Sequence, residues 1–366
     1  MHNKMQYKFK LLSFMILCFS FVRAQESTKI YYLQTYSKID SMLREKSHLN
    51  FREAVLSTEN AYLGGKLDYK HVNHEILTLV KLTNGVSINS PIVYTEADKN
   101  NIIKHSALFQ VLTDTIPVAI DSTHFLLHTP YTYDFEDMWG QKDWTKMFVS
   151  KLLATGKGNC HSMPYLYKIL SEELNIPAYL AFAPNHIYIK TFSQKMGWYN
   201  TELTSGTFPV DAWLMASGYI SVEAVQNGLY MDTLSTKQSV ANCLVDLAQG
   251  YQHKYGKDNP DFVLKCCSTV LKYHPTNVSA MLTKAEAQKF YIQARMKAKN
   301  VKTPEELFTD KSTKEMYADM EQTYVKLHQL GYRRMPEEMY KKWIASLKSE
   351  PNKYNNTQTS GSNKKK

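Results

Sequence analysis

The sequence feature that most constrains the fold is a glycine-rich turn that leads directly into an apolar helix. The turn is Gly156-Lys157-Gly158-Asn159, and Cys160 follows it. Apolar residues then recur at helical spacing, at Met163, Leu166, Ile169, Leu170 and Leu174. This spacing predicts a helix that begins at or near Cys160. The unpaired N–H groups and positive dipole end of such a helix lower the pKa of a thiol, so the site favours a thiolate nucleophile.

Three short strands are predicted to follow this helix. Residues 178–182 form an apolar run, and the turn Pro184-Asn185 separates this run from an alternating segment over residues 186–192. A third segment, residues 198–203, is predicted to pair antiparallel with the second across the 193–197 loop.

The two later strands carry polar side chains on one face each. Alternation places His186 on the same face as Tyr188 and Lys190, and Asn200 on the same face as Glu202. The Cys160 helix packed on this hairpin would bring together a sulfur nucleophile, an imidazole base and a group that orients the imidazole. Nucleophilic catalysis by a thiol requires this set of groups.

In these motifs the segment over residues 130–215 resembles the core of the transglutaminase-like superfamily of papain-type thiol enzymes. That family has a Cys at a helix start, a His on a strand, and an acidic residue in a Gly-Trp-x-x-x-Asp-Pro-Thr pattern on the next strand. Here Cys160 matches the nucleophile, His186 the base, and Gly197-Trp198 with Glu202-Leu203-Thr204 the last motif. Glu replaces the family's Asp and Leu its Pro, so Asn200 remains an alternative to Glu202 as the orienting residue.

The resemblance also implies donors for a developing oxyanion besides the backbone N–H of the nucleophile. The candidates for substrate or oxyanion contacts are Gln141, Tyr133, Trp144 and Trp198. The alternative for these aromatic residues is a role in the core and cleft wall. A metal site from Cys160, His161 and His186 is a further alternative, but no paired Cys-x-x-Cys or His-x-x-x-His spacing supports it. No cofactor is expected, since calcium, which some family members bind, has no acidic loop here.

Residues 1–24 have the pattern of a secretory signal peptide. Lys4, Lys8 and Lys10 precede an apolar run over residues 11–22, which is short for a membrane span. We therefore expect an exported protein, periplasmic or extracellular, with no transmembrane segment after cleavage. The formal charge of +10 falls to +6 when the three lysines and Arg23 leave, and no basic stripe with interleaved aromatics predicts nucleic-acid binding.

Four cysteines remain after cleavage, and we expect all of them to be free thiols. The adjacent pair Cys266-Cys267 lies in one helical run and points in two directions, and Cys243 fits the core as a small hydrophobe. A bridge from Cys243 to one of the pair is the alternative, because an exported protein meets an oxidising environment.

The remaining chain divides by pattern around this core. Residues 25–129 are predicted to be mainly helical, residues 130–220 form the catalytic core, and residues 221–350 are helical. Within 221–350 the apolar spacing resembles tetratricopeptide helices, and one and a half repeats are expected to dock on the core. Residues 351–366 are expected to form a disordered basic tail. The predicted class is therefore α+β: a papain- or transglutaminase-like core flanked by N-terminal helices and a C-terminal repeat-like region.

Two functions follow from this reading. The first is an exported thiol enzyme that cleaves or transfers at amide bonds of peptide or protein substrates through Cys160, His186, and Glu202 or Asn200. The second is a catalytically inactive scaffold that holds a peptide or protein partner, with the C-terminal helices as a protein-binding surface. The sequence does not separate hydrolysis from acyl transfer, because both use the same residues.

Overall fold

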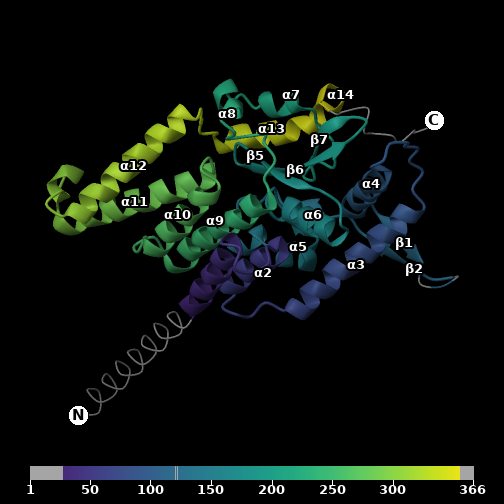
Figure 1. The fold of residues 1–366 in the computed structure, drawn as a ribbon, viewed down its shortest axis with the longest axis horizontal. Helices are drawn as coiled ribbons and strands as arrows, with labels where there is room; N and C mark the ends of the chain where they lie inside the picture. Colours follow the sequence, from purple (N-terminus) through teal and green to yellow (C-terminus); the bar gives the residue numbers. More distant parts are fainter. Residues whose placement is uncertain (1–27, 120, 122, 355–366) are drawn as a thin grey trace, which may run out of the picture.

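The computed structural model describes residues 28–119, 121 and 123–354, and shows a mixed α+β protein (Figure 1). The predicted signal peptide lies outside these residues. Within them, no helix combines the length and apolar character needed to cross a membrane.

The N-terminal region consists of helices followed by one hairpin. Its elements are a helix over residues 28–43, α2 (Phe51–Tyr62), α3 (Tyr69–Ile88), α4 (Lys99–Thr113), β1 (Ile116–Ala119) and β2 (Phe125–His128). The side chain of Asn50 caps α2 by accepting from the Glu53 N–H. The chain leaves α2 through Gly64 and Gly65, both at positive φ, which glycine adopts without steric cost.

The segment that leads to Cys160 consists of a short turn followed by a short helix. Trp144–Met147 form a 3-10 turn, and α5 (Val149–Thr155) begins after it. The buried carboxylate of Glu59 on α2 fixes this start, because it accepts from the N–H groups of Val149 and Ser150 at 2.7 and 3.0 Å. A short parallel pair, β3 (Thr132–Tyr133) with β4 (Lys157–Gly158), holds Tyr133 beside the glycine-rich turn.

The three predicted strands form one antiparallel sheet beside α6 (Ser162–Glu173). Its strands are β5 (Tyr179–Ala183), β6 (His186–Ser193) and β7 (Gly197–Thr201), in the order β5-β6-β7. Asn185, between β5 and β6, has a φ of 57°, which fits the Pro-Asn pair of a type II turn.

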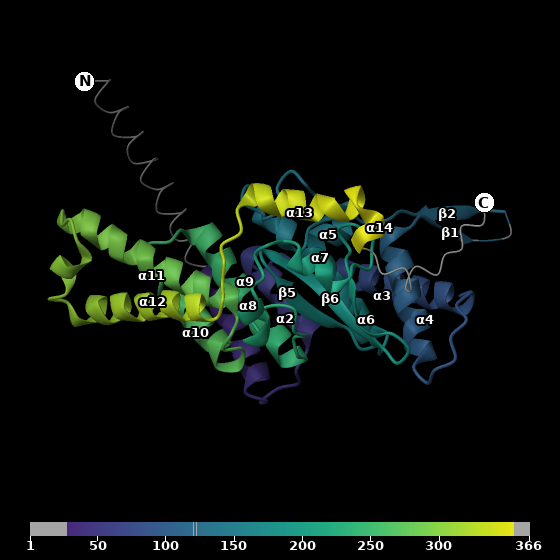
Figure 2. The same ribbon diagram turned by 90° about the horizontal axis from the view of Figure 1, so that it is seen from above.

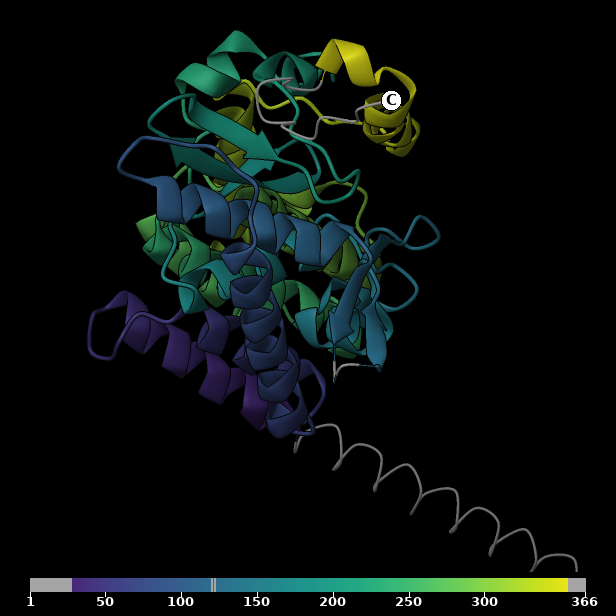
Figure 3. The same ribbon diagram turned by 90° about the vertical axis from the view of Figure 1, so that its right-hand side faces the viewer.

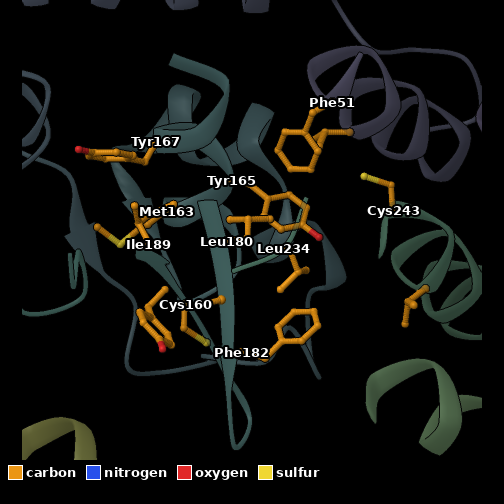
Figure 4. Close-up of a cluster of buried hydrophobic side chains, with 14 of the residues drawn as sticks. Phe51, Cys160, Met163, Tyr165, Tyr167, Leu180, Phe182, Ile189, Leu234 and Cys243 are labelled. Atoms are coloured by element: carbon orange, nitrogen blue, oxygen red, sulfur yellow. The ribbon is translucent and has the colours of Figure 1, made fainter. Parts of the chain in front are cut away.

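One face of the sheet packs on α6. Side chains from both elements interlock in the buried core shown in Figure 4, among them Met163, Tyr167, Leu180, Phe182 and Ile189. The register pairs Ala181 with Tyr188 and Ala183 with His186, so two alanines share the opposite face with the imidazole. Small residues there leave room for the rings that cover His186.

Short helices and the C-terminal helix cover that opposite face. They are α7 (Asp211–Met215), α8 (Val222–Gln226), α13 (Glu337–Ser349) and α14 (Pro351–Tyr354). Figures 2 and 3 show α13 along the side of the sheet away from α6. The start of the predicted disordered tail is wrong, because Pro351–Tyr354 are helical and Tyr354 is buried against the core. The rest of that predicted tail, residues 355–366, lies outside the described residues.

The helices between residues 236 and 329 form a row at one end of the molecule. They are α9 (Thr236–Tyr255), α10 (Asp261–Tyr273), α11 (Val278–Lys299), the 3-10 turn η2 (Pro304–Leu307) and α12 (Lys311–Gln329). Each long helix packs on the next, and α9 also packs on α2. The pair α11–α12 projects from the body, as Figure 1 shows. The four cysteines in the described residues are free and buried.

Candidate active site

The turn that carries Cys160 is held by Asn159, which is fully buried. Its Oδ1 accepts from the backbone N–H groups of His161 and Ser162, both at 3.0 Å, and so caps the start of α6. Cys160 lies between the cap and the helix, and in the described residues its own N–H makes no hydrogen bond. A free N–H at the nucleophile is a suitable donor for an oxyanion.

Cys160 lies at the end of the sheet where β5 turns into β6. Its sulfur is 3.7 Å from the carbonyl oxygen of Asn185, the residue before His186. Burial raises the pKa of the thiol, and the nearby imidazole of His186 outweighs burial and lowers it. The sulfur therefore faces the first residue of β6.

His186 is held by Glu202 from the adjacent strand. Its Nε2 lies 2.5 Å from Glu202 Oε2, and both side chains are buried. The other carboxylate oxygen, Oε1, accepts from the N–H and the hydroxyl of Thr204 at 2.8 and 2.7 Å. The carboxylate is thus fixed on both sides, and it fixes the imidazole with Nδ1 directed toward the thiol side.

The strand register explains why the carboxylate and not the amide meets the imidazole. Ile189 pairs with Thr201 and Lys190 with Asn200. Glu202 therefore lies on the same face of the sheet as His186, two residues nearer to it along the strand than Asn200. The Asn200 amide instead donates to Pro209 O at 3.0 Å and to Asp211 Oδ1 at 2.8 Å.

The electrostatics of the trio favour a thiolate and an imidazolium. Burial lowers the pKa of His186, but the carboxylate of Glu202 and the sulfur of Cys160 raise it to about 10. Burial raises the pKa of Cys160, but the hydrogen bond and charge of His186 outweigh it and hold this pKa below its usual value. Burial likewise opposes the Glu202 charge, and His186 and Thr204 hold its pKa below the usual range.

A second imidazole, that of His161, belongs to the residue that follows Cys160 in the chain. His161 Nδ1 lies 2.9 Å from the carbonyl oxygen of Met147, and Nε2 lies 3.0 Å from Asp246 Oδ1 on α9. Both partners only accept, so both ring nitrogens donate and the ring is an imidazolium. Burial opposes that charge, and Asp246 outweighs it and raises the pKa of His161. The positive ring beside Cys160 further favours the thiolate.

Of the predicted substrate or oxyanion residues, Tyr133 alone is placed beside the thiol. Burial and the charge of Cys160 raise its pKa, and its hydroxyl is 3.2 Å from that of Tyr340. Trp144 is buried against α9, stacked on His253 at 4.5 Å between ring centroids. Trp198 is half exposed and packs on Tyr179 and Phe192.

The backbone N–H of Gln141 donates to Asp137, and its side chain is exposed. The geometry does not support the alternative of a metal site at Cys160, His161 and His186, because both ring nitrogens of His161 are hydrogen-bonded, to Met147 and to Asp246. Nowhere in residues 28–119, 121 and 123–354 do three or more His, Cys, Asp or Glu side chains gather as metal ligands would.

The sequence analysis missed two members of the site. Tyr340 on α13 lies with its hydroxyl 3.1 Å from His186 Nδ1, and the side chain is buried. The spacing of Tyr340 with Trp343, Ile344 and Leu347 predicts a helix with one apolar face, but the sequence does not tell which surface that face covers. Asp246 was visible as a single acid on the apolar face of α9, between Leu244 and Leu247.

Comparison with known proteins adds no family to this geometry. No protein-family model matches the chain, and no curated protein or solved structure is significantly similar to it.

Proposed function

We propose that the protein is an exported thiol enzyme that cleaves or transfers at amide bonds of peptide or protein substrates. The observation that carries the proposal is the buried His186, with Glu202 on Nε2 and the Cys160 side of the site on Nδ1. A carboxylate on Nε2 keeps a proton there, so Nδ1 is the nitrogen that exchanges protons with the thiol. The resemblance to transglutaminase-like enzymes supports the same roles.

The reaction would begin from the thiolate–imidazolium pair. The Cys160 sulfur attacks the amide carbonyl, and the resulting oxyanion accepts from the free Cys160 N–H. As the carbon–nitrogen bond breaks, His186 Nδ1 donates its proton to the leaving amine, and a thioester on Cys160 remains. Water or an amine, deprotonated by the now neutral His186, attacks the thioester, the carbon–sulfur bond breaks, and the thiolate–imidazolium pair is restored. Water gives hydrolysis, and an amine gives transfer.

The closed state of the site is the observation that favours the second candidate, an inactive scaffold. Cys160 is 4% exposed and His186 is 3% exposed. A scaffold needs no accessible thiol, whereas an enzyme has to expose it during turnover. The buried charges favour the enzyme, because a thiolate and two imidazolium rings are costly to bury and a scaffold gains nothing from them.

The test is the pH dependence of Cys160 alkylation by iodoacetamide, measured peptide by peptide in the wild type and in His186→Ala. A thiolate–imidazolium pair predicts labelling that persists well below the ordinary thiol pKa in the wild type. In His186→Ala this low-pH labelling should be lost. Identical profiles that follow an ordinary thiol in both proteins would overturn the proposal.

A further inference from the structure

The most unusual feature of the site is that a helix from the end of the chain occupies it. Tyr340 of α13 places its hydroxyl 3.1 Å from His186 Nδ1 and 3.2 Å from the hydroxyl of Tyr133. Tyr340 is 1% exposed, and burial together with the charge of Cys160 raises its pKa. The hydroxyl thus contacts the imidazole nitrogen that must exchange the proton.

No substrate can react in this arrangement. Attack requires a carbonyl carbon about 3–3.5 Å from the sulfur, with the leaving nitrogen within hydrogen-bond reach of the imidazole. Tyr340 already takes the hydrogen-bonding position at Nδ1, and Trp343 packs edge-on against the same imidazole at 5.4 Å between ring centroids. Catalysis by Cys160 therefore requires α13 to move.

The contacts of α13 suit a cover that separates from the sheet. Its inner face is held by the stack of Trp343 on Trp213, with centroids 4.3 Å apart, by the buried side chains of Ile344 and Leu347, and by two indole hydrogen bonds. Trp343 Nε1 donates to Trp213 O at 3.0 Å, and Trp213 Nε1 donates to Ser346 Oγ at 3.1 Å. Within the described residues, the ion pairs of Lys341 on this helix run to Glu337 and Glu338 of its own first turn.

The segment before α13 is long enough to act as a hinge. Residues 330–336 connect α12 to α13 in an irregular path that Figure 2 shows crossing between the helical row and the sheet. Gly331, at a φ of 86°, lies at the start of this path, and the carbonyl of Met335 near its end accepts from Asn185 Nδ2 at 3.1 Å. Asn185 also contacts Cys160, so the turn between β5 and β6 touches both the end of the hinge and the thiol.

We propose that α13 is a movable cover that keeps the catalytic centre closed, with Tyr340 in the place of substrate. This inference rests on the proposed thiol chemistry. The closed state stores the nucleophile as a thiolate that water and oxidants do not reach, and the substrate polypeptide gains access when α13 leaves the sheet. Tyr340 is then a residue of the resting centre, and Trp343 is the anchor that sets how often the cover opens.

The test is the rate of iodoacetamide labelling of each cysteine at fixed pH, followed by mass spectrometry of the peptides. Cys243, Cys266 and Cys267 are completely buried on α9 and α10, so they report global unfolding. Trp343→Ala removes the anchor, and Tyr340→Phe removes the hydroxyl while keeping the ring. Lys342→Ala is the matched control, because Lys342 lies on the exposed side of the same helix.

We expect Cys160 labelling in Trp343→Ala to be at least about tenfold faster than in the wild type, while the other three cysteines stay protected. A tenfold change corresponds to about 1.4 kcal/mol in the opening equilibrium. Tyr340→Phe should accelerate Cys160 labelling less, and Lys342→Ala should match the wild type. Equal Cys160 rates in all four proteins, or labelling of all four cysteines together, would overturn the proposal.

Hydrogen exchange of the wild type gives a measurement that does not depend on how a variant folds. A cover predicts that the amides of α13 exchange through a local opening, well before those of α6 and β6. Exchange of α13 only together with α6 and β6 would overturn it.

The pH profile of Cys160 labelling in Trp343→Ala separates this inference from the proposed function. If Cys160 becomes accessible but titrates as an ordinary thiol, the cover stands and the thiol enzyme fails. If the thiolate persists at low pH but its labelling is equally fast with and without the anchor, the enzyme stands and the cover fails.

Discussion

Glu202→Gln isolates the orienting carboxylate from the rest of the site. The amide oxygen of Gln can keep the two hydrogen bonds from Thr204, whereas its NH2 group replaces the oxygen that lies 2.5 Å from His186 Nε2. An N–H donor there requires a lone pair on Nε2, which moves the imidazole proton to Nδ1. A neutral imidazole that carries its proton on Nδ1 cannot take the thiol proton there, so the Cys160 thiolate should be lost.

The free energy at stake follows from the raised pKa of His186. The gap between the ordinary value of 6.5 and about 10 corresponds to about 5 kcal/mol in favour of the charged ring. Cys160 contributes to the raised value together with Glu202. We therefore expect Glu202→Gln to lower the free energy of unfolding by about 3 kcal/mol, at the low end of the range for breaking a buried ion pair.

The pH dependence of unfolding tests this assignment best in a Cys160→Ala background. In the wild type the lowered pKa of Cys160 works against the raised pKa of His186, because folding favours loss of a proton from the thiol and gain of one by the imidazole. Without the thiol, the raised pKa of His186 acts alone. Its stabilisation is complete below about 6.5 and is lost toward the folded-state pKa, at about 1.4 kcal/mol per pH unit.

The assay is urea unfolding of Cys160→Ala and of Cys160→Ala with Glu202→Gln across this pH range. Near pH 6 the free energy of unfolding of Cys160→Ala should exceed that of the double variant by about 3 kcal/mol. This difference should become smaller as the pH rises. Other titrating groups are common to both proteins and cancel in the comparison. A gap that stays constant with pH would refute a charged His186 held by Glu202.

Three further predictions test the surroundings of the nucleophile. Asp246→Asn removes the carboxylate that keeps His161 charged, so Cys160 labelling at neutral pH in the Trp343→Ala background should slow severalfold; an unchanged rate would contradict the electrostatic role. Glu59→Gln weakens the cap of α5 and should lower the free energy of unfolding, measured by urea denaturation, by about 1–2 kcal/mol. An unchanged free energy of unfolding would show that water can replace the cap. Gly158→Ala places a Cβ 2.7 Å from the side chain of Leu152 on α5 and should lower the free energy of unfolding by about 1–3 kcal/mol. An unchanged urea midpoint would show that the turn can shift to accommodate the methyl group.

The local parts of the site could be predicted from the sequence because periodicity encodes them. Helical spacing after Cys160 gave the helix start, and strict alternation placed His186 on one face of its strand. The choice between Asn200 and Glu202 was not available from alternation, because both share that face. It depends on the register of β6 and β7, which the 193–197 loop sets by a local geometry that composition does not specify.

The parts that escaped prediction are contacts between distant segments. Tyr340 is 154 residues from His186, and Asp246 is 85 residues from His161. A one-sided apolar helix predicts that its apolar face is buried, but many surfaces can bury it. The same limit applies to Trp144 and Trp198, whose aromatic character fits a cleft, a core or a surface cluster equally well.

The charges around Cys160 show why the cover and the chemistry depend on each other. In the proposed resting state, two imidazolium rings, His186 and His161, face three anions, the carboxylates of Glu202 and Asp246 and the sulfur. The one negative charge left over would be on the sulfur, away from water, where a thiolate needs hydrogen-bond donors. Burial raises the pKa of Cys160, and the Tyr340 hydroxyl helps His186 to hold it below its usual value. In the proposed opening, α13 takes this donor away, so the amide substrate would meet a thiolate that has lost a stabilising partner and is a stronger nucleophile.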